Sequence, residues 1–261
     1  APEKTSIRIG FTLSKSGFAA TSSETLHWKP YNLWKEQVNA AGGIYVKELG
    51  KKLPVEFIWY DDKSDIESVI RLYEKLITED QVDFVLTPWG TGFNLPLVPL
   101  ITKYGHPFIM STCVSLSLLS MFSPYVYHTG SGDGLHVKTY GEFFESIKDD
   151  VQNVAVVYPD VDFGIENGVN IKKFLEERGF NIVLFEMYPV TATDLSSLIL
   201  KAKERNVDTF IAWSYPSDSA LLLTQSMGLG FSPKYMYLAI SLAIPGLLQA
   251  FGEAAEGILT L

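Results

Sequence analysis

Apolar residues in the first half of the chain form short, nearly continuous runs, separated by longer stretches in which they recur three or four positions apart. The short runs predict β-strands and the periodic stretches predict amphipathic helices. In one such stretch Ile66, Val69 and Tyr73 share a helical face, and Asp65 is placed to cap that helix. The predicted strands cover residues 7–13, 55–60, 84–86 and 107–110, and the predicted helices cover residues 22–41, 66–77 and 93–104.

The same alternation restarts in the second half of the chain. Strands are predicted at residues 126–128, 154–158, 183–188, 209–213 and 235–240, and helices at 135–147, 165–178, 194–205, 217–227 and 245–251. Strands that are apolar at nearly every position, alternating with helices, are typical of a parallel sheet covered on both faces. We therefore expect an α/β protein with two β/α halves that meet near residues 123–129.

Composition narrows the function classes. The chain has 261 residues, 47% of them hydrophobic, which is enough for one large core or two ordinary ones. Its net charge of −9 argues against a nucleic-acid partner, which would need a basic face. No apolar run approaches the ~20 residues of a membrane helix, so no direct membrane insertion is expected. The polar start at residues 1–6 suits a mature, secreted N-terminus whose signal peptide has been removed.

Ligands of open α/β sheets bind beyond the carboxyl ends of the strands. In the first half these ends are rich in hydroxyls and glycine, and in the second half they carry aromatic residues. This division suits a small ligand with a polar end and an apolar body. The strand ends are residues 14–16, 61–62, 89–92 and 111–115 in the first half, and 158–164, 188–191, 214–217 and 240–241 in the second.

The strand end at Trp89, Gly90, Thr91 and Gly92 lies directly before a predicted helix. The first backbone N–H groups of a helix lack partners and can hold an anion, so this loop is a candidate anion site. The alternative is a tight connection in which the glycines only permit the turn. The position of the loop at a strand end favours binding.

The motifs of enzymes and metal sites are not found. The glycine-rich stretch 130–134 lacks the G-x-G-x-x-G spacing, and no H-E-x-x-H or phosphate-loop motif occurs. The four histidines show no metal-ligand spacing. Cys113, the only cysteine, is expected to be a small buried residue rather than a nucleophile paired with His106. We predict no catalysis, no metal and no cofactor.

Three stretches resemble the type I periplasmic solute-binding proteins, and more narrowly the leucine–isoleucine–valine-binding family that serves ABC transporters. They are IRIG at residues 7–10 leading to Ser16-Gly17, NAAGGI at 39–44, and YDDKSD at 60–65. The resemblance implies two Rossmann-like lobes with parallel sheets, joined by crossover strands and closing by a hinge on a solute. It implies lobes at 1–124 and 125–252, with 253–261 as a return crossover and the C-terminal part of the family fold missing. It also implies a periplasmic protein with a permease partner and no catalysis.

The resemblance further implies where a ligand is held. The family holds a ligand carboxylate at the loop occupied here by Trp89–Gly92 and again at Thr112, Cys113 and Val114. Ser22 matches a further pocket position of the family. The competing interpretations are that Ser22, Thr91 and Thr112 are helix caps, and that Trp89 serves packing alone.

Two departures from the family pattern bear on the ligand. Amino-acid binders place a hydroxyl where this chain has Val114, and a carboxylate in the region matched by residues 237–241, which includes Ile240 and no acid. A buried ammonium group without a partner costs several kcal/mol. We therefore expect an aromatic or other hydrophobic carboxylate, with Phe163 and Tyr215 against its body.

Two alternatives stay open. Asp160, Asp162 and Asp218 lie at the strand ends of the second half and could instead serve a branched-chain amino acid. The same lobes could also form the sensing domain of a receptor or regulator. In either case Phe163 and Tyr215 could be packing residues without ligand contact.

Overall fold

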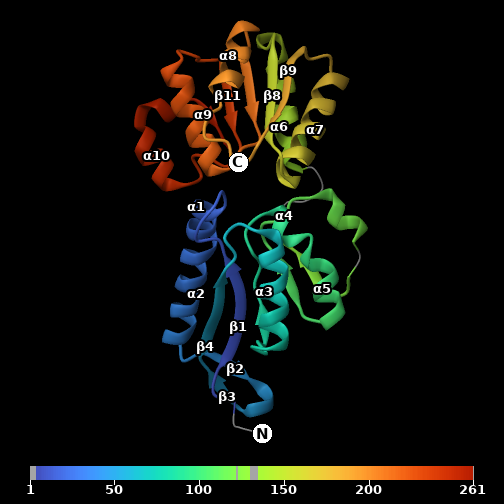
Figure 1. The fold of residues 1–261 in the computed structure, drawn as a ribbon, viewed down its shortest axis with the longest axis vertical. Coiled ribbons are helices and arrows are strands. Elements are labelled where there is room, and N and C mark those ends of the chain that lie inside the picture. The colour runs from blue at the N-terminus through green and yellow to red at the C-terminus, as the bar shows by residue number, and fades with distance from the viewer. Residues whose placement is uncertain (1–3, 122, 130–134, 261) are drawn as a thin grey trace. The chain divides into compact units, whose positions relative to one another are not determined.

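The computed structural model describes residues 4–121, 123–129 and 135–260. The chain divides into two compact units (Figure 1). Unit 1 comprises Ala1–Cys113 and Ser117–Gly130, and unit 2 comprises Val114–Leu116 and Ser131–Leu261. The lobe boundaries expected from the sequence stay a prediction, and the glycine-rich stretch 130–134 lies outside the described residues.

Unit 1 is built on a parallel five-stranded sheet with the strand order β4-β1-β5-β6-β7. Along it, Ile9 of β1 lies in register with Phe57 of β4 on one side and Phe84 of β5 on the other. The strands are β1 (Ile7–Leu13), β4 (Val55–Asp61), β5 (Phe84–Val85), β6 (Phe108–Met110) and β7 (Val126–His128). This confirms a parallel sheet in the first half, but the strand at 126–128 was assigned to the second half and instead pairs with β6 in this sheet.

The helices of unit 1 follow the predicted order but differ in detail. They are α1 (Ala20–Ser22), the π-helix η1 (Ser23–Trp28), α2 (Lys29–Ala40), α3 (Ile66–Thr78), α4 (Thr91–Asn94), α5 (Leu97–Tyr104) and the 3-10 turn η3 (Leu116–Ser120). Asp65 caps α3 as predicted, because its carboxylate accepts the Ser68 N–H at 2.8 Å. An antiparallel hairpin of β2 (Ile44–Val46) and β3 (Lys51–Leu53), joined by the 3-10 turn η2 (Lys47–Leu49), was not predicted.

Two predicted helices are not single regular helices. The stretch 22–41 contains the π-helical segment, and the stretch 93–104 divides into α4 and α5 at Pro96. Proline lacks a backbone N–H and its ring clashes with the preceding turn, which explains the second break.

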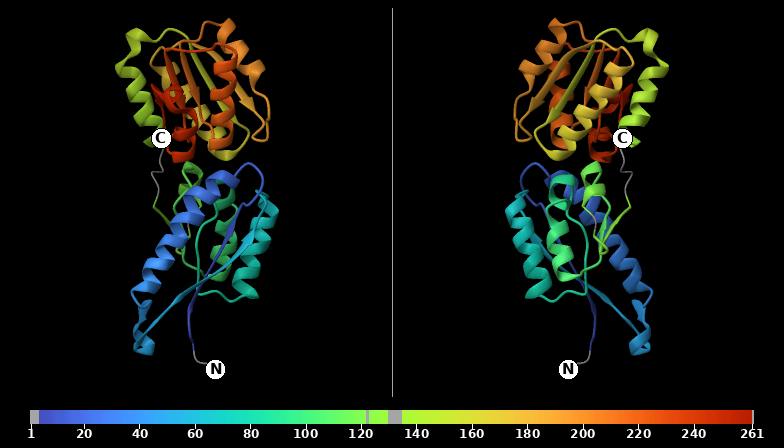
Figure 2. Two further views of the ribbon diagram at one scale, coloured as in Figure 1. Left: turned by 90° about the vertical axis from the view of Figure 1, so that its left-hand side faces the viewer. Right: turned by 90° about the vertical axis from the view of Figure 1, so that its right-hand side faces the viewer.

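Unit 2 carries a second parallel five-stranded sheet, with the order β12-β11-β10-β8-β9. Its strands are β8 (Val154–Pro159), β9 (Ile182–Tyr188), β10 (Thr209–Ala212), β11 (Tyr235–Leu238) and β12 (Ile258–Leu259). Its helices are α6 (Leu135–Ser146), α7 (Asp162–Glu177), α8 (Ser196–Glu204), α9 (Pro216–Gly228) and α10 (Pro245–Phe251), with 3-10 turns η4 (Lys148–Asp150) and η5 (Gly252–Ala255). Figure 2 shows helices on both sides of this sheet.

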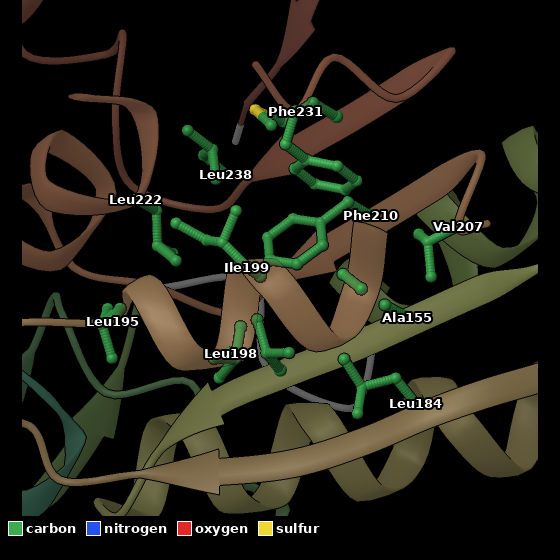
Figure 3. Close-up of a cluster of buried hydrophobic side chains, with 14 of the residues drawn as sticks. Ala155, Leu184, Leu195, Leu198, Ile199, Val207, Phe210, Leu222, Phe231 and Leu238 are labelled. Atoms are coloured by element: carbon green, nitrogen blue, oxygen red, sulfur yellow. The ribbon is translucent and has the colours of Figure 1, made fainter. Parts of the chain in front are cut away.

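A core cluster of unit 2 lies between the sheet and helices α8 and α9 (Figure 3). Phe210 of β10 is fully buried there and meets Phe231 edge-on, with 5.6 Å between the ring centroids. Every residue of β8 and β10 is buried, as expected for strands covered on both faces. Within the described residues, no helix is long and apolar enough to span a bilayer.

Candidate functional site

The loop after β5 is a compact turn closed by its own hydrogen bonds. Gly90 has φ +88°, a conformation that favours glycine, and it precedes the first residue of α4. Its N–H donates to Thr112 Oγ1 at 3.1 Å, and the Thr112 hydroxyl donates to the Pro88 carbonyl at 3.2 Å. The structure therefore brings the two predicted loops, 89–92 and 112–114, together through Gly90 and Thr112. It also shows that these two donors are engaged within the protein.

The side chain of Asn94 holds this turn in place, and sequence analysis did not predict that role. Its side-chain amide donates to the carbonyls of Pro88 at 2.9 Å and Gly90 at 2.7 Å, and the residue is fully buried. The signal in the sequence is an asparagine four residues after Gly90, inside an otherwise apolar helix start. Its role is to position the loop.

The other predicted residues of unit 1 are mostly enclosed. Trp89, Thr91 and Cys113 are buried, while Thr112 and Val114 are partly buried. The burial of Cys113 is as expected, and its backbone carbonyl hydrogen-bonds to the ring of His128. Gly92 lies in the first turn of α4, next to Thr91.

Ser22 and His27 lie on the turn of helix that runs into the π-helical segment. Ser22 is fully buried and His27 is 1% exposed. The Ser22 hydroxyl and both ring nitrogens of His27 have no hydrogen-bond partner among the described residues. The imidazole stacks on Tyr31 with 5.0 Å between centroids and meets the Trp89 ring in a T-shaped arrangement with 6.3 Å between centroids. Burial lowers the pKa of His27 to about 4, so the ring is neutral near pH 7.

Sequence analysis did not nominate His27. A single histidine in a predicted helix carries no metal or catalytic spacing, and its burial depends on the π-helical segment, which has no clear sequence signature. Ser22, in contrast, was nominated only through the family resemblance.

In unit 2 the predicted aromatic residues do lie together. Phe163, in the first turn of α7, stacks on Tyr215 with 5.2 Å between centroids and 14° between ring planes. Trp213 meets Phe163 edge-on at 6.0 Å and is fully buried. Ile240 follows β11 and its N–H donates to the Ser214 carbonyl at 3.0 Å. These residues form an apolar cluster at the carboxyl ends of β8, β10 and β11, in which Phe163 and Tyr215 are 3% and 5% exposed and Ile240 is partly buried.

Of the three acids that could serve an ammonium group, only Asp218 is buried. Asp160 and Asp162 are exposed, and Asp160 accepts the Val190 N–H at 2.7 Å. One Asp218 oxygen accepts the Tyr188 hydroxyl at 2.5 Å, and the other has no partner in the part of the chain that the structure describes. Burial raises the pKa of Asp218 to about 7.

Comparison with known proteins places this geometry in a family. The periplasmic binding protein family matches residues 6–261. A Leu/Ile/Val-binding protein homolog of Brucella suis is 26% identical over 243 residues, which is 89% of this chain and 58% of the relative. A leucine-, isoleucine-, valine-, threonine- and alanine-binding protein of Pseudomonas aeruginosa is 24% identical, covering 86% of this chain and 58% of the relative. The chain thus spans a little over half the length of these relatives.

Solved structures show the same fold. An ABC transporter solute-binding protein of Rhodopseudomonas palustris in complex with 3,4-dihydroxybenzoic acid matches with a TM-score of 0.81 and 20% identity, over 98% of this chain and 68% of that one. A branched-chain amino acid transporter substrate-binding protein of Streptococcus pneumoniae in complex with isoleucine also gives 0.81, at 24% identity, over 98% and 70%. The predicted fold class and the resemblance to the branched-chain amino acid-binding family are confirmed.

Proposed function

We propose that this chain, which belongs to the periplasmic binding protein family, is the solute-binding component of an ABC importer and binds an aromatic or hydrophobic carboxylate. Its family consists of solute-binding proteins rather than enzymes. In this proposal the protein works in the periplasm and delivers its ligand to a permease. The observation that carries the ligand class is the Phe163–Tyr215 stack at the strand ends of unit 2.

Three further observations support an aromatic or hydrophobic acid. The Val114 side chain cannot accept a hydrogen bond from an ammonium group, and residues 237–241 contain no acid. The strand ends of unit 1 instead supply hydroxyls and the amides of the first turn of α4. Solved relatives of this fold include one with bound 4-hydroxybenzoate and one with bound 3,4-dihydroxybenzoic acid.

The mechanism we propose is a conformational equilibrium that the ligand shifts. A ligand that contacts residues of both units stabilises a closed form over an open one, by the difference between its affinities for the two. The polar end of the ligand would be held by unit 1 and its apolar body by the aromatic residues Phe163 and Tyr215 of unit 2. The transporter would then recognise the closed form.

A second candidate ligand is a branched-chain α-amino acid. Asp218 favours it, because a buried carboxylate with one unpartnered oxygen is a suitable partner for an ammonium group. A solved relative with bound isoleucine has the same fold. In this case Asp218 would be ionised in the complex.

Thermal melts against a matched panel test these candidates. The panel is benzoate, 4-hydroxybenzoate, benzamide, leucine and isoleucine. A ligand at a concentration 100 times its dissociation constant adds about 2.7 kcal/mol to the free energy of unfolding. For a chain of this size this raises the melting temperature by roughly 5–10 °C. A shift with the aromatic acids but not with benzamide supports the proposal. A shift with leucine or isoleucine alone favours the amino acid, and no shift with any acid contradicts the proposed function.

Thr91→Val tests the predicted loop. Loss of a hydrogen bond to a charged group should weaken binding of the best acid by about 1.5–3 kcal/mol, measured by titration calorimetry. Thr78→Val is the matched control, since Thr78 is exposed at the end of α3 and bonds to the Glu74 carbonyl at 2.8 Å. If both variants bind with unchanged affinity, Thr91 does not belong to the site.

A further inference from the structure

Two polar side chains lie close together in the sequence where α1 passes into the π-helical segment. Ser22 is the last residue of α1, and His27 follows five residues later inside η1, whose backbone hydrogen bonds run from i to i+5. Both residues are almost completely buried, and neither side chain has a hydrogen-bond partner among the described residues. Buried polar groups in proteins are nearly always hydrogen-bonded, and π-helical segments frequently lie at functional sites. This pair therefore calls for a partner from outside the chain.

The loop 89–92 and Thr112 do not supply all the hydrogen-bond donors that a ligand carboxylate needs. The Gly90 N–H and the Thr112 hydroxyl, both expected to bind the ligand, are joined to each other and to the Pro88 carbonyl. The imidazole of His27 makes a T-shaped contact with Trp89, the first residue of the same loop. Unpartnered donors in this region thus come from the helix side rather than from Gly90 and Thr112.

We propose that His27 and Ser22 bind the carboxylate of the ligand in unit 1. This inference rests on the proposed function, and it adds to the site a residue, His27, that the family resemblance did not indicate. A neutral imidazole donates one N–H, and a serine hydroxyl donates one O–H. Two donors match the two oxygens of a carboxylate.

The surroundings of His27 favour this contact over one with water. Tyr31 stacks on the ring and Trp89 makes a T-shaped contact with it, and the Tyr31 hydroxyl donates to the Thr87 carbonyl at 3.2 Å. Tyr31 is the titratable group in contact with the ring, and it is uncharged at neutral pH. Hydrogen bonds to a charged group are stronger in such an apolar environment than in water.

The test uses His27→Phe and Ser22→Ala in the full chain. Phenylalanine keeps an aromatic ring against Tyr31 while removing both nitrogens, and alanine removes only the hydroxyl. With benzoate and 4-hydroxybenzoate as probes, we expect each variant to bind about 10- to 100-fold more weakly in calorimetry. His27→Gln, which retains an N–H donor, should recover part of the loss.

His106→Phe is the matched control. His106 is a partly buried histidine of the same unit, just before β6, and burial also lowers its pKa. It belongs neither to the loop 89–92 nor to the helical turn 22–27, so its replacement should leave affinity unchanged. Circular dichroism of each variant establishes that the fold is retained.

Direct contact is checked by nitrogen NMR of the histidine side chains. The chain has four histidines, and His27→Phe identifies the signals of His27. Saturation with benzoate should shift the His27 ring nitrogens more than those of the other three.

The outcomes separate the two proposals. If no acid of the panel binds the wild-type protein, the proposed function fails and this inference with it. If the acids bind but His27→Phe and Ser22→Ala bind equally well and the His27 signals do not move, only this inference is wrong.

Discussion

The two units repeat one β/α pattern, yet their sheets are covered to different extents. In unit 2, β8 and β10 are buried at every position. In unit 1, β5, β6 and β7 expose Phe84, Ile109 and Tyr127 by 48%, 53% and 56%. Their neighbours Val85 and Phe108 are buried, so these strands have one covered face and one open face.

The packing of the helices explains this difference. In unit 1, Tyr73 of α3 meets Phe108 edge-on at 6.1 Å, which places α3 on the covered face. On the opposite face, Val38 of α2 packs against the cluster that contains Ile9 and Val55, and this cluster covers β1 and β4. Ile109 and Tyr127 lie further along that face and stay about half exposed. An apolar strand residue therefore does not by itself report a covered face.

The largest effect that sharpens this comparison is expected in the core of unit 2. Phe210→Ala removes a fully buried ring from between β10 and its neighbours. Large-to-small changes of this kind cost about 3–5 kcal/mol. Chemical denaturation followed by tryptophan fluorescence should report it, with Trp28, Trp34, Trp59 and Trp89 each replaced by Phe so that Trp213 of unit 2 gives the signal. A loss below about 1 kcal/mol would show that this core is not closed as described.

The next effect depends on pH and also lies in unit 2. Burial raises the pKa of Asp218 to about 7 from its usual 3.8, so the folded state holds a proton that the unfolded state has released between these values. Stability from this group is present below pH 4 and is lost as pH rises to about 7. The loss is on the order of 4 kcal/mol, since each pKa unit corresponds to about 1.4 kcal/mol.

Asp218→Asn should remove most of this loss. Asparagine can still accept the Tyr188 hydroxyl, but its buried amide costs about 1–2 kcal/mol. We therefore expect the variant to be about 2–3 kcal/mol more stable than the wild type at pH 8 and no more stable at pH 4. Urea denaturation at both pH values measures this. Equal stability differences at the two pH values would mean that Asp218 is not buried in its neutral form.

His27 provides the opposite case in unit 1. Its pKa falls to about 4 from 6.5, so its contribution to stability is present above pH 6.5 and is lost as pH falls towards 4. The two units thus respond to pH in opposite directions, one through a buried base and the other through a buried acid. His27→Phe should remove the loss of stability that His27 causes between pH 6.5 and pH 4. At pH 8 His27 is neutral in the folded and the unfolded state, so removing its titration should have no effect on stability there. Urea denaturation at pH 4.5 and at pH 8 measures the two stabilities.

Local signals explain which parts of the fold could be predicted from the sequence. Asp65 caps α3 because its carboxylate reaches an amide three residues away, and β1 is evident from its own apolar pattern. The π-helical segment and the open face of β6 depend on what packs against them, which no short stretch encodes. For the candidate site, the Phe163–Tyr215 pair followed from strand-end position, whereas Asn94 and His27 acquire their surroundings only from the fold.

The smallest expected effect tests the open face itself. Ile109→Thr replaces an apolar side chain that is about half exposed, and such surface changes are usually within about 0.5 kcal/mol. Ile211→Thr is the matched control, since Ile211 is 1% exposed in β10, where a buried hydroxyl and a lost methyl group both cost stability. Urea denaturation should therefore show a loss of stability several times larger for Ile211→Thr than for Ile109→Thr.

Binding of a hydrophobic dye to the native protein should fall with Ile109→Thr, because contiguous exposed apolar residues attract such probes. Equal losses of stability in the two variants would mean that the face of unit 1 is covered in solution, and the contrast between the two sheets would then lie in what covers them rather than in whether they are covered.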